Sequence, residues 1–204
     1  VGTVVILALE MFNSFKDMSW HEALFTAMFH SVSSRSGGLV TFDVTQFGEG
    51  TNIFMSALMF IGASPSSVGG GIRTTTFAIA ILFLINFARG KNEIQIFNRE
   101  IELIDVFRSY AVIILAIFMV LVATMALSIS EPNLPITALV FEITSAFGTC
   151  GMSLGITDDL SSFGKVLIMI LMFIGRVGLI SFLFTIGGRA TKTKYQFPKE
   201  RVII

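Results

Sequence analysis

The stretch SPSSVGGGIRTTT (residues 64–76) lies within an otherwise apolar run that extends over residues 53–88. As one continuous helix, this run would be about 54 Å long at ~1.5 Å per residue. The hydrocarbon core of a bilayer is only about 30 Å thick, and tilt alone does not absorb such an excess. The polar stretch therefore predicts a break, over residues 62–76, that divides the run into two shorter helices.

Composition indicates that lipid is the solvent of the chain. Of its 204 residues, 53% are hydrophobic and 14% are charged, whereas soluble domains carry about 25% charged residues. The 14 basic and 14 acidic residues balance, so no nucleic acid is expected as a partner. The single cysteine, Cys150, cannot form an internal disulfide. We therefore expect an integral membrane protein.

The remaining segments predict an all-α fold. Residues 1–12 are typical of the tail of a transmembrane helix, so we expect the chain to be part of a larger protein. Basic residues cluster in the loop 89–103 and near the C-terminus, which predicts that both are cytoplasmic. The other expected elements are a short helix over 20–33, a spanning helix over 104–129, a turn and short helix over 131–147, a spanning helix over 166–186 and a basic tail over 189–204.

An internal repeat organises these elements. LMFIG occurs at residues 58–62 and again 113 residues later, at 171–175, and the same offset relates Gly38 to Gly151. Each copy combines an outer helix, a short helix, a glycine turn and an inner helix, which is the plan of a pore-loop unit. We expect one unit over residues 1–88 and another over 104–188, and two further units elsewhere in the complete pore.

The two glycine turns suit cation binding through the backbone. A short helix directs its partially negative C-terminus toward the membrane interior, and the following turn can offer carbonyl oxygens that replace the hydration shell of an ion. Irregular backbone at that depth is tolerated where it lines a cavity or is buried in protein. The alternative, that Gly38 and Gly151 are ordinary helix caps, is disfavoured by their matched positions.

Several stretches resemble the Trk/Ktr/HKT superfamily of cation transporters. SVSSRSGGLVTFD (31–43) and SAFGTCGMSLGITDDL (145–160) resemble its third and fourth filter segments, and GASPSSVGGGIRTTTFA (62–78) resembles the intramembrane gating loop of its third repeat. GRVG (175–178) resembles its last inner helix, and the tail TKTKYQFPKERVII (191–204) is similar to that of KtrB membrane subunits. Leu39 departs from the family, which often has phenylalanine after the filter glycine.

This resemblance implies potassium uptake through a pseudo-fourfold pore rather than an enzymatic activity. K⁺ would bind at backbone carbonyls near Gly38 and Gly151, and Arg176 would form an electrostatic barrier in the pore. Na⁺ is a candidate activator, and no covalently bound cofactor is expected. The implied assembly is a homodimer on a cytosolic, KtrA-like ring of RCK subunits, which alone would bind nucleotide. The implied filter consists of Ser34, Arg35, Ser36, Gly37, Gly38, Gly148, Thr149, Cys150 and Gly151, and the implied gate loop contains Gly62, Ser64, Pro65, Ser66, Ser67, Gly69, Gly70, Gly71, Thr74 and Thr75.

Alternatives remain open for the whole chain and for single residues. A Trk-type or sodium-preferring transporter would have the same fold as a potassium uptake subunit. A membrane enzyme or a purely structural membrane subunit would have a different kind of function. The polar stretch could be a stabilised kink rather than a gate, and Arg176 could pair with Glu142. Arg35 is a poor ion ligand, so we expect it to brace the filter loop by bonding carbonyls. We expect Cys150 to contribute its carbonyl rather than its thiol.

Overall fold

The computed structural model describes residues 1–16, 18–65, 67, 69–90, 95, 96 and 99–179. The expected basic tail, the predicted 166–186 helix from residue 180 onward and Ser66 lie outside these residues. The prediction of an unbroken helix over 166–186 was wrong within the described residues, because the helix ends at Val177 and Gly178 has φ 85°. The described chain is helical apart from one small hairpin, which confirms the predicted all-α class. The elements are α1 (Gly2–Glu10), α2 (Trp20–Ser33), the 3-10 helix η1 (Val44–Gln46), α3 (Glu49–Phe60), α4 (Thr74–Ala88), the antiparallel strands β1 (Gln95–Ile96) and β2 (Arg99–Glu100), α5 (Leu103–Ser130), α6 (Ile136–Gly148) and α7 (Ser162–Val177).

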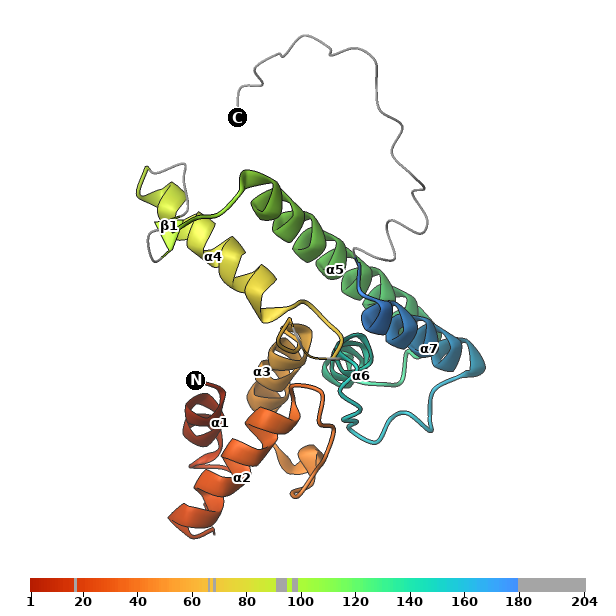
Figure 1. Cartoon of the computed structure of the whole chain (residues 1–204). Coiled ribbons are helices and arrows are strands. Elements are labelled where there is room, and N and C mark those ends of the chain that lie inside the picture. Colours follow the sequence, from red (N-terminus) through yellow and green to blue (C-terminus); the bar gives the residue numbers. More distant parts are fainter. Residues whose placement is uncertain (17, 66, 68, 91–94, 97–98, 180–204) are drawn as a thin grey trace.

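The short helix α6 lies at the centre of the arrangement (Figure 1). It packs against α3, α5 and α7, while α1 and α2 pack together beside α3 and α4 runs along α5. From Ala138 to Gly148 the residues of α6 are buried, apart from the half-buried Val140. α6 therefore connects the group formed by α1, α2 and α3 to the group formed by α5 and α7.

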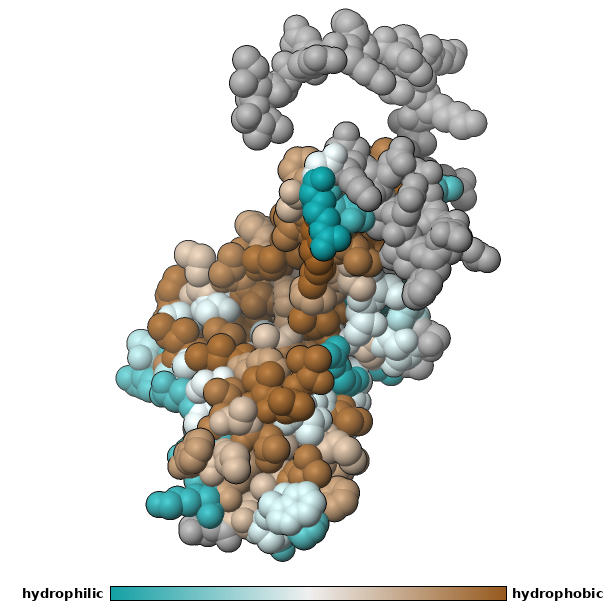
Figure 2. Space-filling model, turned by 90° about the vertical axis from the view of Figure 1, so that its left-hand side faces the viewer, coloured by the Kyte–Doolittle hydropathy of each residue, from teal (hydrophilic) through white to brown (hydrophobic). Residues whose placement is uncertain are grey.

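The long helix α5 has the surface of a helix that faces lipid. It is the one described helix that is long and apolar enough to cross a membrane. Its buried positions include small residues such as Ala116 and Ala123, whereas Phe107, Phe118 and Met125 are exposed. The face seen in Figure 2 is largely apolar as well. Large apolar side chains outside and small ones at helix contacts are typical of proteins in a bilayer.

The polar stretch does break the apolar run. α3 ends at Phe60, and Ile61 leaves the helical region with φ −82° and ψ 80°. The chain then folds back on itself: the amide of Ile72 donates to the carbonyl of Phe60 (3.2 Å), and the amide of Thr74 donates to the carbonyl of Ala63 (3.3 Å). We call residues 61–73 the break loop.

The break is displaced from the predicted range of 62–76. Thr74 and Thr75, which were expected in the loop, lie in the first turn of α4, and Arg73 is its N-cap. The first four amide groups of a helix need no acceptor within that helix. A helix can therefore begin at polar residues such as Thr74 and Thr75, just before the apolar sequence resumes. The expectation that these threonines belong to the irregular loop was therefore wrong.

The two copies of the LMFIG segment differ in secondary structure. The first helix ends at Phe60, whereas α7 continues through the second copy as far as Val177. The sequence after each copy explains the difference. A proline within a helix clashes with the carbonyl four residues earlier, and Pro65 stands four residues after Ile61, where the first helix stops. RVG follows the second copy and contains no proline.

Two glycines allow the backbone of α6 to approach its neighbours closely. A Cβ atom on Gly148 would overlap the carbonyl oxygen of Met59 in α3, and a Cβ atom on Gly175 in α7 would overlap the carbonyl oxygen of Phe147. These contacts join the end of α6 to both inner helices. They also lie directly beside the second glycine turn.

We predict that Gly148→Ala destabilises the fold. The added methyl group meets backbone rather than a flexible side chain, and overpacking of this kind costs about 1–3 kcal/mol. The melting temperature of the complete transporter, purified in detergent, measures the effect.

Gly50→Ala is the matched control, because Gly50 is exposed in the first turn of α3 and has no atom near the position of an added Cβ. Its melting temperature should equal or exceed that of the wild type. Equal melting temperatures for the two variants would contradict the close approach of α6 to α3.

Candidate functional site

The two glycine turns repeat the same backbone geometry. Each follows the C-terminus of a short helix, α2 or α6, whose partial negative charge faces the turn. In the first turn Ser36 has φ 100° and Gly38 has φ 64°; in the second Thr149 has φ 51° and Gly151 has φ 89°. Both pairs are related by the 113-residue offset of the repeat. The internal repeat therefore extends from sequence to backbone conformation.

The two turns lie in direct contact. A Cβ atom on Gly38 would overlap the carbonyl oxygen of Cys150, so only glycine permits this approach. The buried thiol of Cys150 donates to the carbonyl of Ser34 at 2.8 Å. The expectation for Cys150 was therefore incomplete: its carbonyl faces the neighbouring turn, but its thiol also holds a carbonyl of the implied filter.

A serine hydroxyl from each short helix holds the far end of its turn. Ser33 Oγ donates to the carbonyl of Leu39, and Ser145 Oγ donates to the carbonyl of Met152, both at 2.6 Å. Leu39 and Met152 each follow the turn glycine and are related by the same offset. The two serines were not among the predicted site residues, although a hydroxyl residue near the end of each short helix is a signal that the sequence contains.

A group of carbonyls in the two turns has no partner among the described residues. The carbonyls of Ser33, Ser34 and Ser145, which precede the turns, accept amide or thiol hydrogen bonds. Free carbonyl oxygens in contacting turns are the ligands that suit a dehydrated alkali cation. No described donor reaches the carbonyls of Arg35, Ser36, Gly37, Gly38, Thr149, Cys150 or Gly151.

The guanidinium of Arg35 points away from these carbonyls. Its Nη1 donates to the carbonyl of Ile61 at 2.7 Å and to that of Gly62 at 3.2 Å. Arg35 was expected to brace the filter loop by bonding carbonyls, and the carbonyls that it bonds belong to the break loop. Arg35 thus connects the first turn to the start of the break loop.

The break loop also contacts both turns at its glycines. The amide of Gly70 donates to Thr149 Oγ1 at 2.8 Å, and a Cβ atom on Gly69 would overlap Ser36 Oγ. The backbones of Gly62 and Gly70 touch each other, and Gly71 has φ 79°. Ser64, Pro65 and Ser67 are instead exposed. The structure thus brings the glycines of the loop to the turns, but not these three residues.

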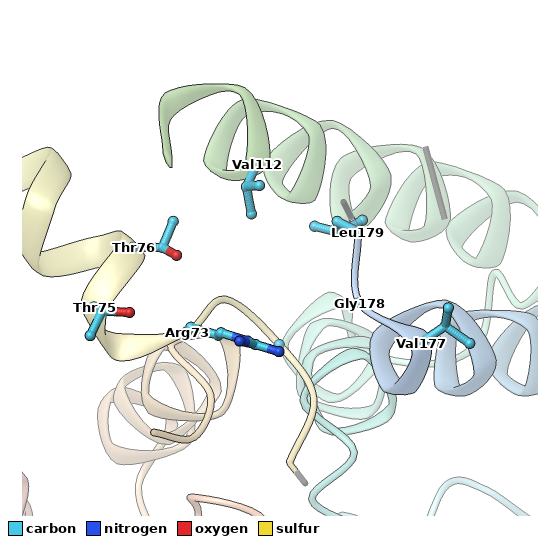
Figure 3. Close-up of a pocket in the computed structure, with 8 residues that line it drawn as sticks. Arg73, Thr75, Thr76, Val112, Val177, Gly178 and Leu179 are labelled. Atoms are coloured by element: carbon cyan, nitrogen blue, oxygen red, sulfur yellow. The ribbon is translucent and has the colours of Figure 1, made fainter. Parts of the chain in front are cut away.

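A cavity of about 380 Å³ lies on the other side of the break loop. Figure 3 shows the side chain of Arg73 extending into it between α4 and α7. Because Gly69 and Gly70 contact the turns while Gly71 and Arg73 line the cavity, the loop lies between the two. The cavity is lined by Gly71, Arg73, Thr75, Thr76, Val112, Val177, Gly178 and Leu179.

Arg176 does not pair with Glu142. The carboxylate of Glu142 instead accepts hydrogen bonds from the hydroxyls of Ser153 and Thr157. Arg176 is exposed on α7, next to Val177, which lines the cavity. Within the described part of the chain, the single ion pair joins Arg108 to Asp105. The suggested pairing of Arg176 with Glu142 was therefore wrong, because local hydroxyls satisfy that carboxylate.

We predict that Gly38→Ala lowers the melting temperature of the complete transporter more than Gly151→Ala does. Both variants place a methyl group at positive φ, which costs roughly 1–2 kcal/mol. Only the methyl group at position 38 would also overlap the Cys150 carbonyl, since nothing lies within 4 Å of a Cβ atom at position 151.

Melting temperatures of both variants in KCl, measured beside the wild type, give the comparison. Equal losses would mean that the two turns are not in contact.

Comparison with known proteins agrees with this geometry. The chain matches the TrkH family of cation transport proteins over residues 2–188. It is 52% identical over 203 residues to Ktr system potassium uptake protein D of Bacillus subtilis, covering 100% of this chain and 45% of that protein. It is 36% identical over 181 residues to Ktr system potassium uptake protein B of the same organism, covering 89% and 40%.

The fold matches that of a solved transporter. The crystal structure of the potassium transporter TrkH from Vibrio parahaemolyticus superposes with a TM-score of 0.76 at 16% identity, covering 90% of this chain and 41% of that one. The chain spans less than half the length of the curated relatives that it matches here. The resemblance seen in the sequence is confirmed: the chain belongs to the TrkH family of cation transport proteins.

Proposed function

We propose that the complete protein takes up K⁺ across the cell membrane and that this chain supplies two of the four filter turns of its pore. The observation that carries the proposal is the contact of the break loop with both glycine turns. Carbonyls without hydrogen-bond partners lie in those turns, near Gly38 and Gly151, and a loop lies directly beside them. That arrangement suits a carbonyl filter with a movable obstruction below it.

The break loop is the gate in this proposal. It separates the turns from the cavity beyond, so an ion leaving the filter must displace it. Among the described residues its hydrogen bonds to the turns are those of Arg35 and Gly70, and its Gly69 lies against Ser36. A permanent kink would not require consecutive glycines against the filter. The loop therefore fits a gate better than a static kink.

Arg176 acts as an electrostatic barrier on the path beyond the gate. An arginine within a spanning helix costs about 2.5–3.5 kcal/mol on insertion scales, so it is expected to face a pore or a partner rather than lipid. Its position beside the cavity-lining Val177 and Gly178 supports a place along the ion path.

The larger assembly is the one that the resemblance to the Trk/Ktr/HKT superfamily implies. We infer a homodimer in a bacterial cell membrane, with the 89–103 loop and the C-terminus in the cytoplasm, on an RCK ring that binds the nucleotide. The basic residues of that loop and of the C-terminal tail support the orientation. Two relatives carry the name of Ktr potassium uptake proteins, which favours K⁺ over a sodium-preferring function. Activation by Na⁺ remains a prediction.

Flux measurements on the complete transporter in proteoliposomes test the proposal. Deletion of Gly69, Gly70 and Gly71 is expected to raise passive K⁺ flux, because it removes the contacts of the loop with both turns. Gly38→Asp is expected to abolish or reduce the preference for K⁺ over Na⁺, because it places a carboxylate among the filter carbonyls.

Gly50→Ala, on the exposed side of α3, serves as the folded control and should transport like the wild type. If the deletion variant and Gly38→Asp both fold and transport K⁺ and Na⁺ as the wild type does, the turns are not a filter and the loop is not a gate.

A further inference from the structure

Thr149 and Ser36 are exceptional in their backbone conformation. They are the only non-glycine residues with positive φ in the described part of the chain. They occupy equivalent positions in the two repeats, 113 residues apart. The left-handed region is unfavourable for residues with a Cβ atom, and a β-branched threonine is uncommon there. Such conformations persist where the surrounding contacts impose them, and they cluster at switch regions.

Both side chains are directed at consecutive glycines of the break loop. Thr149 Oγ1 accepts the amide hydrogen bond of Gly70 at 2.8 Å, and Ser36 Oγ lies against the Cα of Gly69. The Ser36 hydroxyl is buried and has no hydrogen-bond partner among the described residues. The two positions therefore differ: Thr149 forms a hydrogen bond to the break loop, whereas Ser36 makes only a packing contact with it.

Thr149 has a second role through its own backbone. Its carbonyl is one of the turn carbonyls to which no described donor bonds, while its hydroxyl holds the loop. The same residue thus connects the ion-binding turn to the gate. If the break loop moves, the Gly70 amide leaves Thr149 Oγ1. If Thr149 leaves its left-handed conformation, its hydroxyl moves away from the break loop.

We propose that Thr149 is a positioning residue that couples the filter to the gate: its hydroxyl holds the break loop closed while its turn keeps the conformation that binds the ion. This inference rests on the proposed function, because it assumes that the loop is the gate. Coupling of this kind is reciprocal. An ion that stabilises the turn also stabilises the closed loop, and removal of the ion loosens the loop.

Thr149→Val tests the hydroxyl, because valine keeps the shape and the β-branch and removes the acceptor. In the complete transporter, unstimulated K⁺ flux into proteoliposomes is expected to rise about two- to tenfold, the range that corresponds to one net hydrogen bond. Thr149→Ser restores the hydroxyl and should recover most of the closed state. Thr124→Val is the matched control, since Thr124 Oγ1 bonds only the Val120 carbonyl within α5.

Hydrogen–deuterium exchange of peptides that cover the break loop provides a readout that does not depend on transport. Wild-type protein should exchange more slowly there in KCl than in choline chloride. Thr149→Val should exchange faster than the wild type, and the difference between the two salts should disappear. Thr149→Gly, which also relieves the positive φ and is expected to fold, should behave in the same way.

The outcomes separate the two proposals. Wild-type exchange in the break loop of both Thr149→Val and Thr149→Gly would overturn the coupling role, whatever the flux. A loosened loop in a protein whose wild type carries no K⁺ would support the hydroxyl contact and overturn the transport function. Altered K⁺ over Na⁺ preference in Thr149→Val, with unchanged loop exchange, would assign Thr149 to selectivity alone and overturn the coupling.

Discussion

The structure depends on one constraint: where water is scarce, backbone amides and carbonyls outside helices need hydrogen-bond partners or a cation. Three segments leave the helices in the middle of this chain: the two glycine turns and the break loop. In a bilayer each unpaired amide or carbonyl is costly, and hydrogen bonds between these segments satisfy some of their groups. The Arg35 guanidinium bonds the first carbonyls of the break loop, the Cys150 thiol bonds the Ser34 carbonyl, and the Thr149 hydroxyl bonds the Gly70 amide. The carbonyls without a described donor include those of the two contacting turns, where a cation can serve as their partner.

Close backbone approach is the second condition of this arrangement. Four glycines lie directly against a backbone carbonyl of another residue. The pairs are Gly38 with Cys150, Gly62 with Gly70, Gly148 with Met59 and Gly175 with Phe147. A methyl group at any of these positions would separate the segments. The glycines therefore do more than permit turns, because they determine how near the two glycine turns, the break loop and the inner helices lie.

The two repeats share one plan but differ in their inner helices. Their turns share the same pattern of positive φ and a serine bond at the far end. Their inner helices differ, since the first is broken after Phe60 and the second continues past Gly175. The first inner helix is therefore broken within the first copy of LMFIG, whereas after the second copy α7 continues as far as Val177 and carries Arg176.

The sequence by itself determined the membrane class, the helix order and the existence of the break. The apolar composition indicates a lipid environment, and a continuous helix over residues 53–88 would be longer than a bilayer is thick. Pro65 and three consecutive glycines disfavour such a helix. It also identified the two turns, because a repeated pentapeptide places Gly38 and Gly151 at the same offset.

Only the tertiary structure decided which polar groups meet. The bonds from Arg35 to Ile61, from Cys150 to Ser34 and from Gly70 to Thr149 join residues that are 26, 116 and 79 positions apart. No local pattern encodes such pairs. The return to helix at Thr74 and the hydroxyl partners of Glu142 likewise depend on packing and on the donors nearby, rather than on residue type. Short-range physics defines the elements of this protein, and the long-range pairing of backbone groups assembles its candidate ion path.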